Sequence, residues 1–289
     1  MKRLALILSF LLPLLAYGQD YVTTPADSLL AEEILASLKA QRQAAPAQLL
    51  QRGDGVVAGL MVSAGKALEG REYVAGTLDV PGGERLRIHL TQTDCILFVE
   101  TCLALARTAA QDGGFDMFVE ELRQSRYRDG QVTAYADRLH YTTEWGLQGI
   151  ERGVLQDVTP SLGGVVRNHP VSYMSTHPDL YPLMDDVEAI RSAEKRINSV
   201  PSYYIPSKQI SQALGGIRSG DIICFVTTVA GLDVSHVAMA VSDGSGPVRL
   251  LHASTGAMKV LTEPRTLPEY LAARPSVAGI RILRPLDPR

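Results

Sequence analysis

A chain of 289 residues, 46% of them hydrophobic, is long enough to bury one large core, and we expect a single globular unit. Its formal net charge of −3, without Lys/Arg clusters, excludes the electropositive surface typical of proteins that bind nucleic acid or anionic membranes. Three cysteines exclude a disulfide scaffold, and because neither they nor the six histidines have metal-ligand spacing, we expect no metal and no cofactor.

The N-terminal segment has the features of a secretory signal peptide. The basic start Met1-Lys2-Arg3 precedes the mostly apolar residues 4–15, and the small-x-small tripeptide Ala16-Tyr17-Gly18 follows. The apolar run is shorter than the ~20 residues that a membrane-spanning helix needs. We therefore expect residues 1–18 to be removed on export, leaving a protein without stable membrane insertion.

Helical patterns dominate the first third of the chain. Residues 26–52 carry apolar positions at helical spacing and are divided by Ala45-Pro46, which predicts a pair of N-terminal helices. Another apolar helix is expected over residues 55–68. Residues 94–110 contain no Gly or Pro and are apolar on most faces, which predicts a buried helix with Thr93 or Asp94 as its N-cap.

The middle of the chain, from residue 125 to 210, is irregular and rich in Tyr, His, Pro and Ser, apart from short helices such as one over 186–198. Long irregular segments in a compact domain usually form a functional rim or lid, so we expect substrate-recognition loops here. In the last third of the chain the spacing of apolar residues changes from helical to strand-like. Its strand-like runs are separated by short turns and predict an antiparallel meander over residues 221–228, 235–242, 248–254 and 257–261. Helices first and strands afterwards indicate an α+β fold.

Cys95 is the candidate nucleophile. At the first turn of a helix, unpaired backbone N–H groups and the helix dipole favour an anion, so we expect a lowered thiol pKa and a site for an oxyanion. Cys102 lies two turns deeper in the same helix, and Cys224 lies within an apolar strand. Both of these are expected to be core residues.

His236 and His252 are the candidate base and its partner. In a hairpin centred on Gly244, residues whose numbers sum to 488 face each other, which makes the two imidazoles cross-strand neighbours; a shift of two residues keeps them on one face. The small residues Ala238 and Ala240 on that face leave room for a helix end. A Cys–His pair with a third group holding the base is suited to acyl transfer, although a lone strand histidine is more often a satisfied core or surface residue.

Three motifs together resemble the NlpC/p60 superfamily of cell-wall cysteine hydrolases. They are Asp94-Cys95 at the start of an apolar helix, Ser235-His236-Val237-Ala238 on one strand, and Leu251-His252-Ala253-Ser254 on the next. The resemblance implies a papain-like core in which a catalytic helix packs on the meander. It also implies that Cys95, His236 and His252 are nucleophile, base and third polar residue.

Further stretches are similar to one branch of this superfamily, over about residues 55–286. They are Asp94 to Glu100, Arg138-Leu139-His140-Tyr141 with Trp145, Tyr204-Ile205-Pro206, and Gly231 to His236. The branch, formerly of unknown function, is associated with N-acetylmuramoyl-L-alanine amidase activity on 1,6-anhydromuropeptides. The resemblance thus implies a periplasmic enzyme with a small glycopeptide substrate, and we expect a monomer.

The start of the catalytic helix departs from the family pattern. Ordinary superfamily members have Ser-Gly after the catalytic Cys, where this chain has Ile96-Leu97, and the amidase branch commonly has Thr at position 97. Asp94 matches a residue that binds a free amino group in endopeptidase members. In an amidase it would instead bind the substrate amide N–H or serve only as an N-cap.

Tyr73 resembles the superfamily Tyr that precedes the catalytic helix and helps to position the substrate, although a packed core Tyr is an equal alternative. It lies 22 residues before Cys95, and a hairpin at Pro81-Gly82-Gly83 within residues 77–90 would account for the length.

Other polar and aromatic residues are candidates for a sugar- and peptide-binding cavity, because aromatic faces stack on sugars and Arg can hold a carboxylate. Packing within loops is the alternative for each of them taken singly. They are Arg138, His140, Tyr141, Trp145, Tyr203, Tyr204, Ser235 and Ser254.

The sequence patterns predict a signal peptide (1–18) and an N-terminal helical extension (19–54). The resemblance implies that residues 55–289 form a cysteine amidase domain, which cuts the MurNAc–L-Ala bond of muropeptides. Two alternatives stay open. One is a γ-D-Glu-diaminopimelate endopeptidase with the same triad, and the other is a muropeptide-binding protein without turnover.

Overall fold

The computed structural model describes residues 20–44, 55–242 and 246–289. The signal peptide expected over residues 1–18 lies outside these ranges, as does the second helix expected near residues 46–52. The part of the chain that the structure describes has no helix both long and apolar enough to cross a membrane.

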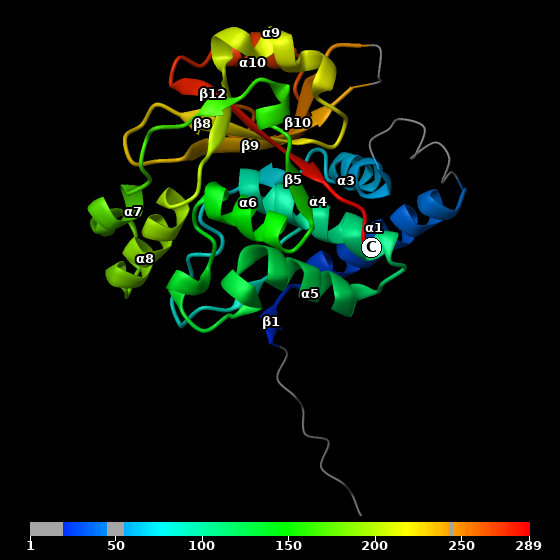
Figure 1. The fold of residues 1–289 in the computed structure, drawn as a ribbon. Coiled ribbons are helices and arrows are strands. Elements are labelled where there is room, and N and C mark those ends of the chain that lie inside the picture. Colours follow the sequence, from blue (N-terminus) through cyan, green and yellow to red (C-terminus); the bar gives the residue numbers. More distant parts are fainter. Residues whose placement is uncertain (1–19, 45–54, 243–245) are drawn as a thin grey trace, which may run out of the picture.

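A large mixed sheet forms the centre of the molecule (Figure 1). Its strands run in the order β4-β2-β11-β10-β9-β8-β12-β7-β6, and β5 also pairs with β12. The predicted meander is confirmed: β8 (Ile222–Thr227), β9 (Val234–Val241), β10 (Arg249–Ser254) and β11 (Lys259–Thr262) are successive antiparallel neighbours. The sequence patterns did not predict the long strand β12 (Val277–Pro285). The other strands of the sheet are β2 (Glu72–Tyr73), β4 (Gln92–Thr93), β5 (Leu155–Asp157), β6 (Val165–Val166) and β7 (Tyr203–Pro206).

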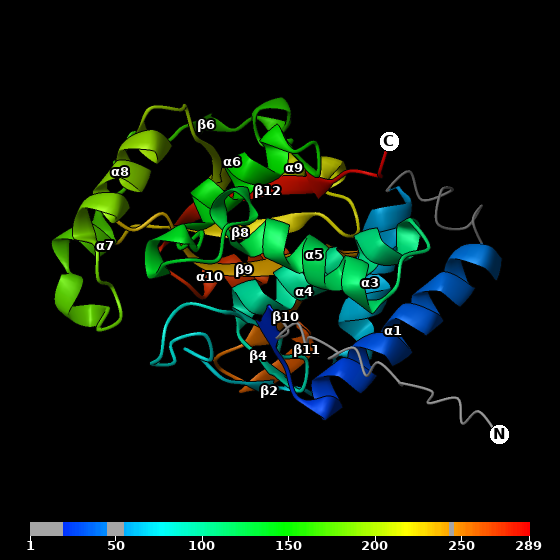
Figure 2. The same cartoon turned by 90° about the horizontal axis from the view of Figure 1, so that it is seen from below.

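Helices cover both faces of this sheet (Figure 2). One face is covered by α3 (Val56–Ala67) and α4 (Cys95–Ala110), with α1 (Pro25–Ala44) and α5 (Phe115–Arg126) packed outside them. The opposite face is covered by the short α9 (Ile210–Ala213) and α10 (Leu267–Ala272). The predicted helices over 55–68 and 94–110 are confirmed, and the arrangement is a mixed α+β fold.

The two faces of the meander bury different residues. Cys224, Val237 and Met239 face α3 and α4, whereas Phe225 and Ala238 belong to the core beneath α10. Because strand side chains alternate between faces, the imidazole of His236 points to the same side as Ala238, away from the body of α4. This alternation decides from which side the histidines reach the site.

A third cluster stands beside the sheet, at the left of Figure 1. It contains α7 (Tyr173–Thr176) and α8 (Val187–Asn198), and the segment before α6 (Thr142–Glu151) joins it. The predicted helix over 186–198 is confirmed, with Asp186 as its N-cap. The irregular middle of the chain is therefore a packed flank with its own small apolar core.

The hairpin predicted within residues 77–90 is wrong. Its only strand, β3 (Leu86–Arg87), pairs in parallel with β1 (Tyr21–Val22) near the N-terminus. Nearby, the buried Asp27 carboxylate at the start of α1 accepts hydrogen bonds from the amides of Leu90 and Thr91, both at 2.8 Å. These long-range contacts, rather than a local turn, fix the position of residues 77–90.

The predicted register of β9 and β10 is also wrong, by two residues. Met239 faces Leu251 and Ala240 faces Leu250, so paired numbers sum to 490 rather than 488. His252 thus lies opposite Ala238, and His236 is its diagonal neighbour. A shift of two residues preserves the shared face, so the pair still meets.

Candidate active site

Cys95 is the first residue of α4, and its position is set by the helix cap. Asp94 has extended backbone, and its Oδ1 accepts a hydrogen bond from the Leu97 amide at 2.9 Å. The expectation that Thr93 or Asp94 caps this helix is therefore confirmed for Asp94. The Cys95 and Ile96 amides, which lie before the first turn is complete, both reach the sulfur.

The thiol reaches the sheet where two strands part. Pairing of β9 with β10 ends at Met239 and Leu251. The amide of Val237, which alternation directs to the same side of the strand as Met239, donates instead to the Cys95 sulfur. Residue 95 thus lies against the amide that directly follows His236. Among the described residues, no hydrogen bond joins the thiol to the imidazole itself.

His236 and His252 form a hydrogen-bonded pair. Nε2 of His236 lies 2.7 Å from Nδ1 of His252, with the rings edge to face. His252 is completely buried, and its Nε2 lies 3.8 Å from Oε2 of the buried Glu263. The Tyr270 ring packs edge-on against His252 at 5.5 Å between centroids. The Nδ1 atom of His236 makes none of these contacts.

Burial keeps the Cys95 thiol and the imidazoles of His236 and His252 neutral. It lowers the pKa of His236 to about 3, with further lowering by His252 and Arg274. It also lowers the pKa of His252 to about 4, although the Glu263 carboxylate opposes this. Burial and then Asp94 raise the pKa of the Cys95 thiol to about 12. The expectation of a lowered thiol pKa is therefore wrong, because desolvation and a neighbouring carboxylate outweigh the amides of the helix start.

Tyr73 lies close to the thiol despite the intervening segment. Strand β2 pairs in parallel with β4, so Tyr73 stands opposite Thr93, two residues before Cys95. Burial, followed by the proximity of Cys95 and Asp94, raises the pKa of the Tyr73 hydroxyl to about 12. The structure therefore brings together Tyr73, Asp94, Cys95, His236 and His252.

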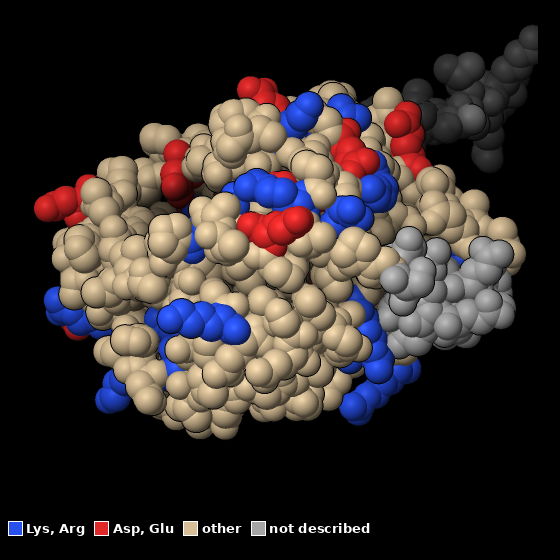
Figure 3. All heavy atoms as spheres, turned by 90° about the horizontal axis from the view of Figure 1, so that it is seen from above, with Lys and Arg blue, Asp and Glu red and all other residues tan. Residues whose placement is uncertain are grey.

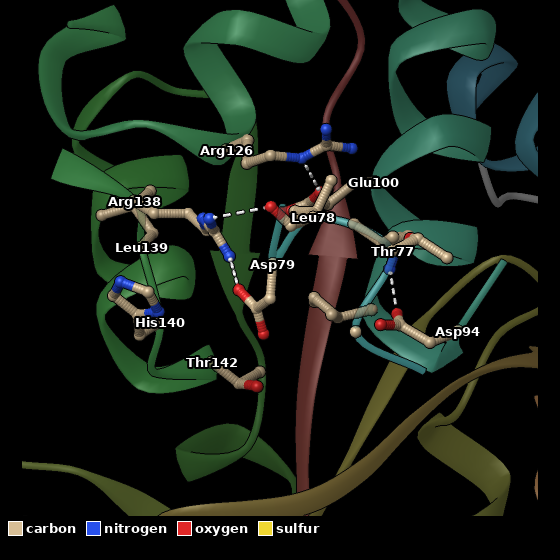
Figure 4. A pocket seen from close by; sticks show the side chains of 13 residues that line it. Thr77, Leu78, Asp79, Asp94, Glu100, Arg126, Arg138, Leu139, His140 and Thr142 are labelled. Atoms are coloured by element: carbon tan, nitrogen blue, oxygen red, sulfur yellow. Dashed lines mark hydrogen bonds and ion pairs between the residues drawn. The ribbon is translucent and has the colours of Figure 1, made fainter. Parts of the chain in front are cut away.

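A pocket opens beside the start of α4 (Figure 4). Asp94 and Ile96 form part of its lining, together with the charged side chains of Asp79, Glu100, Arg126 and Arg138. Glu84 lies behind the lining and completes this charged cluster through Arg138. Arg138 bonds Asp79 at 2.8 Å and Glu84 at 2.7 Å, and Arg126 bonds Glu100 at 2.8 Å. Both guanidiniums are already paired, so Arg138 lines the pocket without being free to hold a substrate carboxylate.

His140 also lines this pocket, but its ring is committed. Its Nε2 donates to the Tyr135 carbonyl at 2.8 Å, and its ring packs on that of Tyr135. Burial, followed by the charge of Arg138, lowers the pKa of His140 to about 3. It presents a neutral ring face to the pocket rather than a charge.

Tyr141 and Trp145 lie inside the protein. The Tyr141 hydroxyl donates to Glu194 at 2.7 Å and accepts from the Met174 amide at 2.8 Å, which ties α6 to α7 and α8. Trp145 is 2% exposed and donates to Ser125 Oγ at 3.1 Å. The structure gives both of them packing roles within the fold.

Tyr203 and Tyr204 lie on β7, three strands away from β9, or about 14 Å at the usual strand spacing. The structure therefore does not bring them to the thiol. Ser235 is exposed on β9 directly before His236, and Ser254 Oγ accepts from the Ala257 amide in the turn after β10. These two serines flank the histidines along the chain.

Three residues beside the histidine pair were missed at the level of sequence. Glu263 follows β11, Tyr270 lies on α10, and Arg274 places its guanidinium 3.3 Å from the centre of the Tyr270 ring. The register of β10 with β11 could have found Glu263. No local pattern could have found the other two, because α10 approaches the sheet only through the tertiary fold.

Comparisons with known proteins show the family of the chain. The AmiA-like family, described as N-acetylmuramoyl-L-alanine amidase-like, matches residues 63–280. The chain belongs to this family. A solved N-acetylmuramoyl-L-alanine amidase from Bacteroides uniformis is 33% identical, with a TM-score of 0.75 over 81% of this chain and 100% of that one. A comparison with curated proteins gives no match.

Two further solved structures share the fold of this amidase-like protein. One, from Bacteroides fragilis and described as a xylanase candidate, is 37% identical, with a TM-score of 0.71 over 77% of this chain and 99% of that one. A Legionella pneumophila protein is 20% identical, with a TM-score of 0.64 over 90% and 97%, and it shows the likeness of fold alone.

Proposed function

We propose that the protein is a cysteine amidase, with a papain-like NlpC/p60 core, that hydrolyses the MurNAc–L-Ala amide bond of (1,6-anhydro)muropeptides in peptidoglycan degradation or recycling. The observation that carries the proposal is the meeting of a helix-start thiol with the strand that bears His236, itself bonded to His252. Membership in the amidase-like family supports the type of bond. Export to the periplasm, a monomeric state and independence of cofactors belong to the same proposal.

The reaction uses the neutral groups described above. As the thiol attacks the lactyl carbonyl carbon, Nδ1 of His236 takes its proton and a C–S bond forms. Amides at the start of α4, together with that of Val237, stabilise the oxyanion. The imidazolium then protonates the departing L-Ala nitrogen, and the C–N bond breaks to leave a thioester. Water, deprotonated by His236, releases the lactyl acid and restores the Cys95 thiol.

The pocket beside α4 suits a substrate rich in hydrogen-bond donors. Its two arginines are paired, whereas Asp94 offers an oxygen beyond the one that caps α4, and Asp79 is half-exposed. Carboxylate oxygens accept N–H and O–H groups, which the amides and hydroxyls of a glycopeptide supply. In this proposal Asp94 therefore caps the helix and also accepts a hydrogen bond from the substrate.

Mass spectrometry of a digested anhydromuropeptide tests the scissile bond. The amidase releases a bare disaccharide and the whole stem peptide. A γ-D-Glu-diaminopimelate endopeptidase would leave a disaccharide that carries a dipeptide, and a binding protein would give no product while retaining affinity. EDTA should leave the rate unchanged. A dipeptide-bearing sugar as the main product would contradict the proposal.

The face above α9 and α10 carries charged side chains of both signs (Figure 3). There, Lys and Arg lie over the whole view, and Asp and Glu lie mainly in its upper half (Figure 3). Such a face lacks the basic stripe that nucleic-acid recognition requires. The partner that we propose is a small glycopeptide, a muropeptide.

A further inference from the structure

Glu263 stands at the end of a diagonal that crosses three strands. Its amide donates to the Leu250 carbonyl at 2.7 Å, which extends the β10–β11 pairing in which His252 faces Leu261. Residues two apart on a strand share a face, so Glu263 and His252 are diagonal neighbours on that face. His252 and His236 are diagonal neighbours in the same sense. The three side chains therefore run obliquely across β9, β10 and β11.

Both carboxylate oxygens of Glu263 accept hydrogen bonds from Arg265, and Oε2 faces the histidine as well. Arg265 donates through Nε to Oε1 at 2.7 Å and through Nη2 to Oε2 at 3.1 Å. Oε2 also faces Nε2 of His252 at 3.8 Å, and this nitrogen is completely buried without a hydrogen-bond partner. A buried, unpartnered nitrogen aimed at a carboxylate needs an explanation, because an unsatisfied buried polar atom destabilises the folded state.

We propose that Glu263 is a positioning residue, whose Oε2 receives the Nε2–H of His252 and thereby fixes where the protons lie on both histidines. The proposal rests on the proposed function, in which Cys95 is the nucleophile and His236 its base. Glu263 touches neither the substrate nor the sulfur and acts only through the two imidazoles.

The donor and acceptor roles follow one another along the diagonal. An ionised carboxylate only accepts, so His252 carries its proton on Nε2 and presents a lone pair on Nδ1. That lone pair accepts the Nε2–H of His236 across the 2.7 Å contact. The proton of His236 is then fixed on Nε2, and Nδ1 keeps the lone pair that takes the thiol proton. Reversing the first donor would reverse all the others.

Glu263→Gln and Glu263→Met together test this order. Arg265 donates most closely to the Oε1 position, so the Gln carbonyl is expected there and its NH₂ group at the Oε2 position. The NH₂ group would donate to His252 and leave His236 with a proton on Nδ1, facing the thiol. We expect kcat to fall at least about 100-fold in Glu263→Gln with KM within about twofold. Glu263→Met, which imposes no tautomer, should lose less, roughly 10–100-fold.

A merely structural role predicts the opposite ranking. Met leaves Arg265 and His252 without a polar partner, so Glu263→Met should have the lower urea midpoint although it keeps the higher kcat. Activity that follows the order of stability would overturn the proposal, as would a Gln variant within about threefold of wild type. If Glu263→Met does not fold, the kcat of Glu263→Gln decides alone. Glu269→Ala is the matched control, because it removes the exposed carboxylate that caps α10 and should leave kcat unchanged.

A second readout needs no substrate. Cys102 and Cys224 are completely buried, so iodoacetamide labelling at pH 7, followed by peptide mass spectrometry, reports the reactivity of Cys95. We expect slower labelling in Glu263→Gln than in wild type. Slower labelling without muropeptide cleavage by the wild type would support Glu263 and reject the proposed substrate. Cleavage with unchanged labelling and kcat would support the substrate and reject Glu263.

Discussion

Two buried polar clusters lie on either side of the start of α4, and they treat charge differently. In the charged cluster, Arg126 pairs with Glu100, and Arg138 pairs with Glu84 and Asp79, so each guanidinium has a carboxylate within 3 Å. In the histidine pair, Nε2 of His236 and Nδ1 of His252 are hydrogen-bonded to each other. The charge of Arg274 disfavours a positive charge on either ring.

The difference follows from what each cluster can supply. Burying a charge is tolerated only when an opposite charge lies beside it, and otherwise the group loses its charge. The charged cluster can shape a pocket of fixed polarity. In the proposed mechanism, the histidine pair, which burial holds neutral, accepts the proton that the thiol gives up. The predictions below test this division, starting with the largest expected effect.

Cys95→Ala removes the proposed nucleophile. We expect turnover of an anhydromuropeptide to fall by at least about 1000-fold, because the remaining groups of a thiol–imidazole site cannot form the covalent intermediate. Cys102→Ala is the control: it truncates a buried core side chain in the same helix and should lower stability without abolishing turnover. Unchanged product formation by Cys95→Ala would contradict the mechanism.

Arg126→Met should destabilise the protein by about 3–5 kcal/mol, because it leaves the buried Glu100 carboxylate without its partner. Urea unfolding at pH 7 measures the loss. The double change Arg126→Met with Glu100→Leu removes both charges and should recover much of the stability. If the single change cost no more than the double, the pair would not be compensating buried charge.

Acidification should weaken the fold through the histidines. In the unfolded chain each binds a proton near pH 6.5, whereas in the folded protein the pKa of His236 is about 3 and that of His252 about 4. The unfolded state therefore gains protons first as the pH falls below 6.5. We expect each histidine to cost on the order of 1–2 kcal/mol of stability between pH 7 and pH 5.

Urea unfolding at the two pH values measures this loss, and His252→Asn gives the comparison. The variant has one fewer neutral buried imidazole, so its stability should decline less steeply over this interval. His140, whose pKa is also lowered to about 3, contributes to both proteins equally. An equal decline in the variant and the wild type would mean that His252 is not held neutral.

Trp145→Phe should have the smallest effect. It removes the indole N–H that donates to Ser125 while keeping an aromatic ring in the core, which should cost about 1 kcal/mol. Thermal unfolding measures this loss, and kcat and KM for the muropeptide should stay unchanged. A large rise in KM would instead give Trp145 a part in binding the substrate.

The sequence by itself determined the elements whose signals are local. The absence of Gly and Pro from residues 94–110, with Asp94 at the start, predicted the helix and its cap. Alternating apolar residues and intervening turn residues predicted strands β8 to β11. The period of two in a strand also made the shared face of His236 and His252 robust, even though their register was shifted by two residues.

Only the tertiary structure decided the features that depend on long-range contacts. Asp27 holds the segment that was expected to be a hairpin, Arg138 is paired rather than free, and burial raises the thiol pKa that the helix start alone would lower. Glu263 and Arg274 reach the histidines through strand register and the packing of α10. Such effects depend on which groups become buried against each other in the folded protein. Spacing along the chain does not show which groups those are.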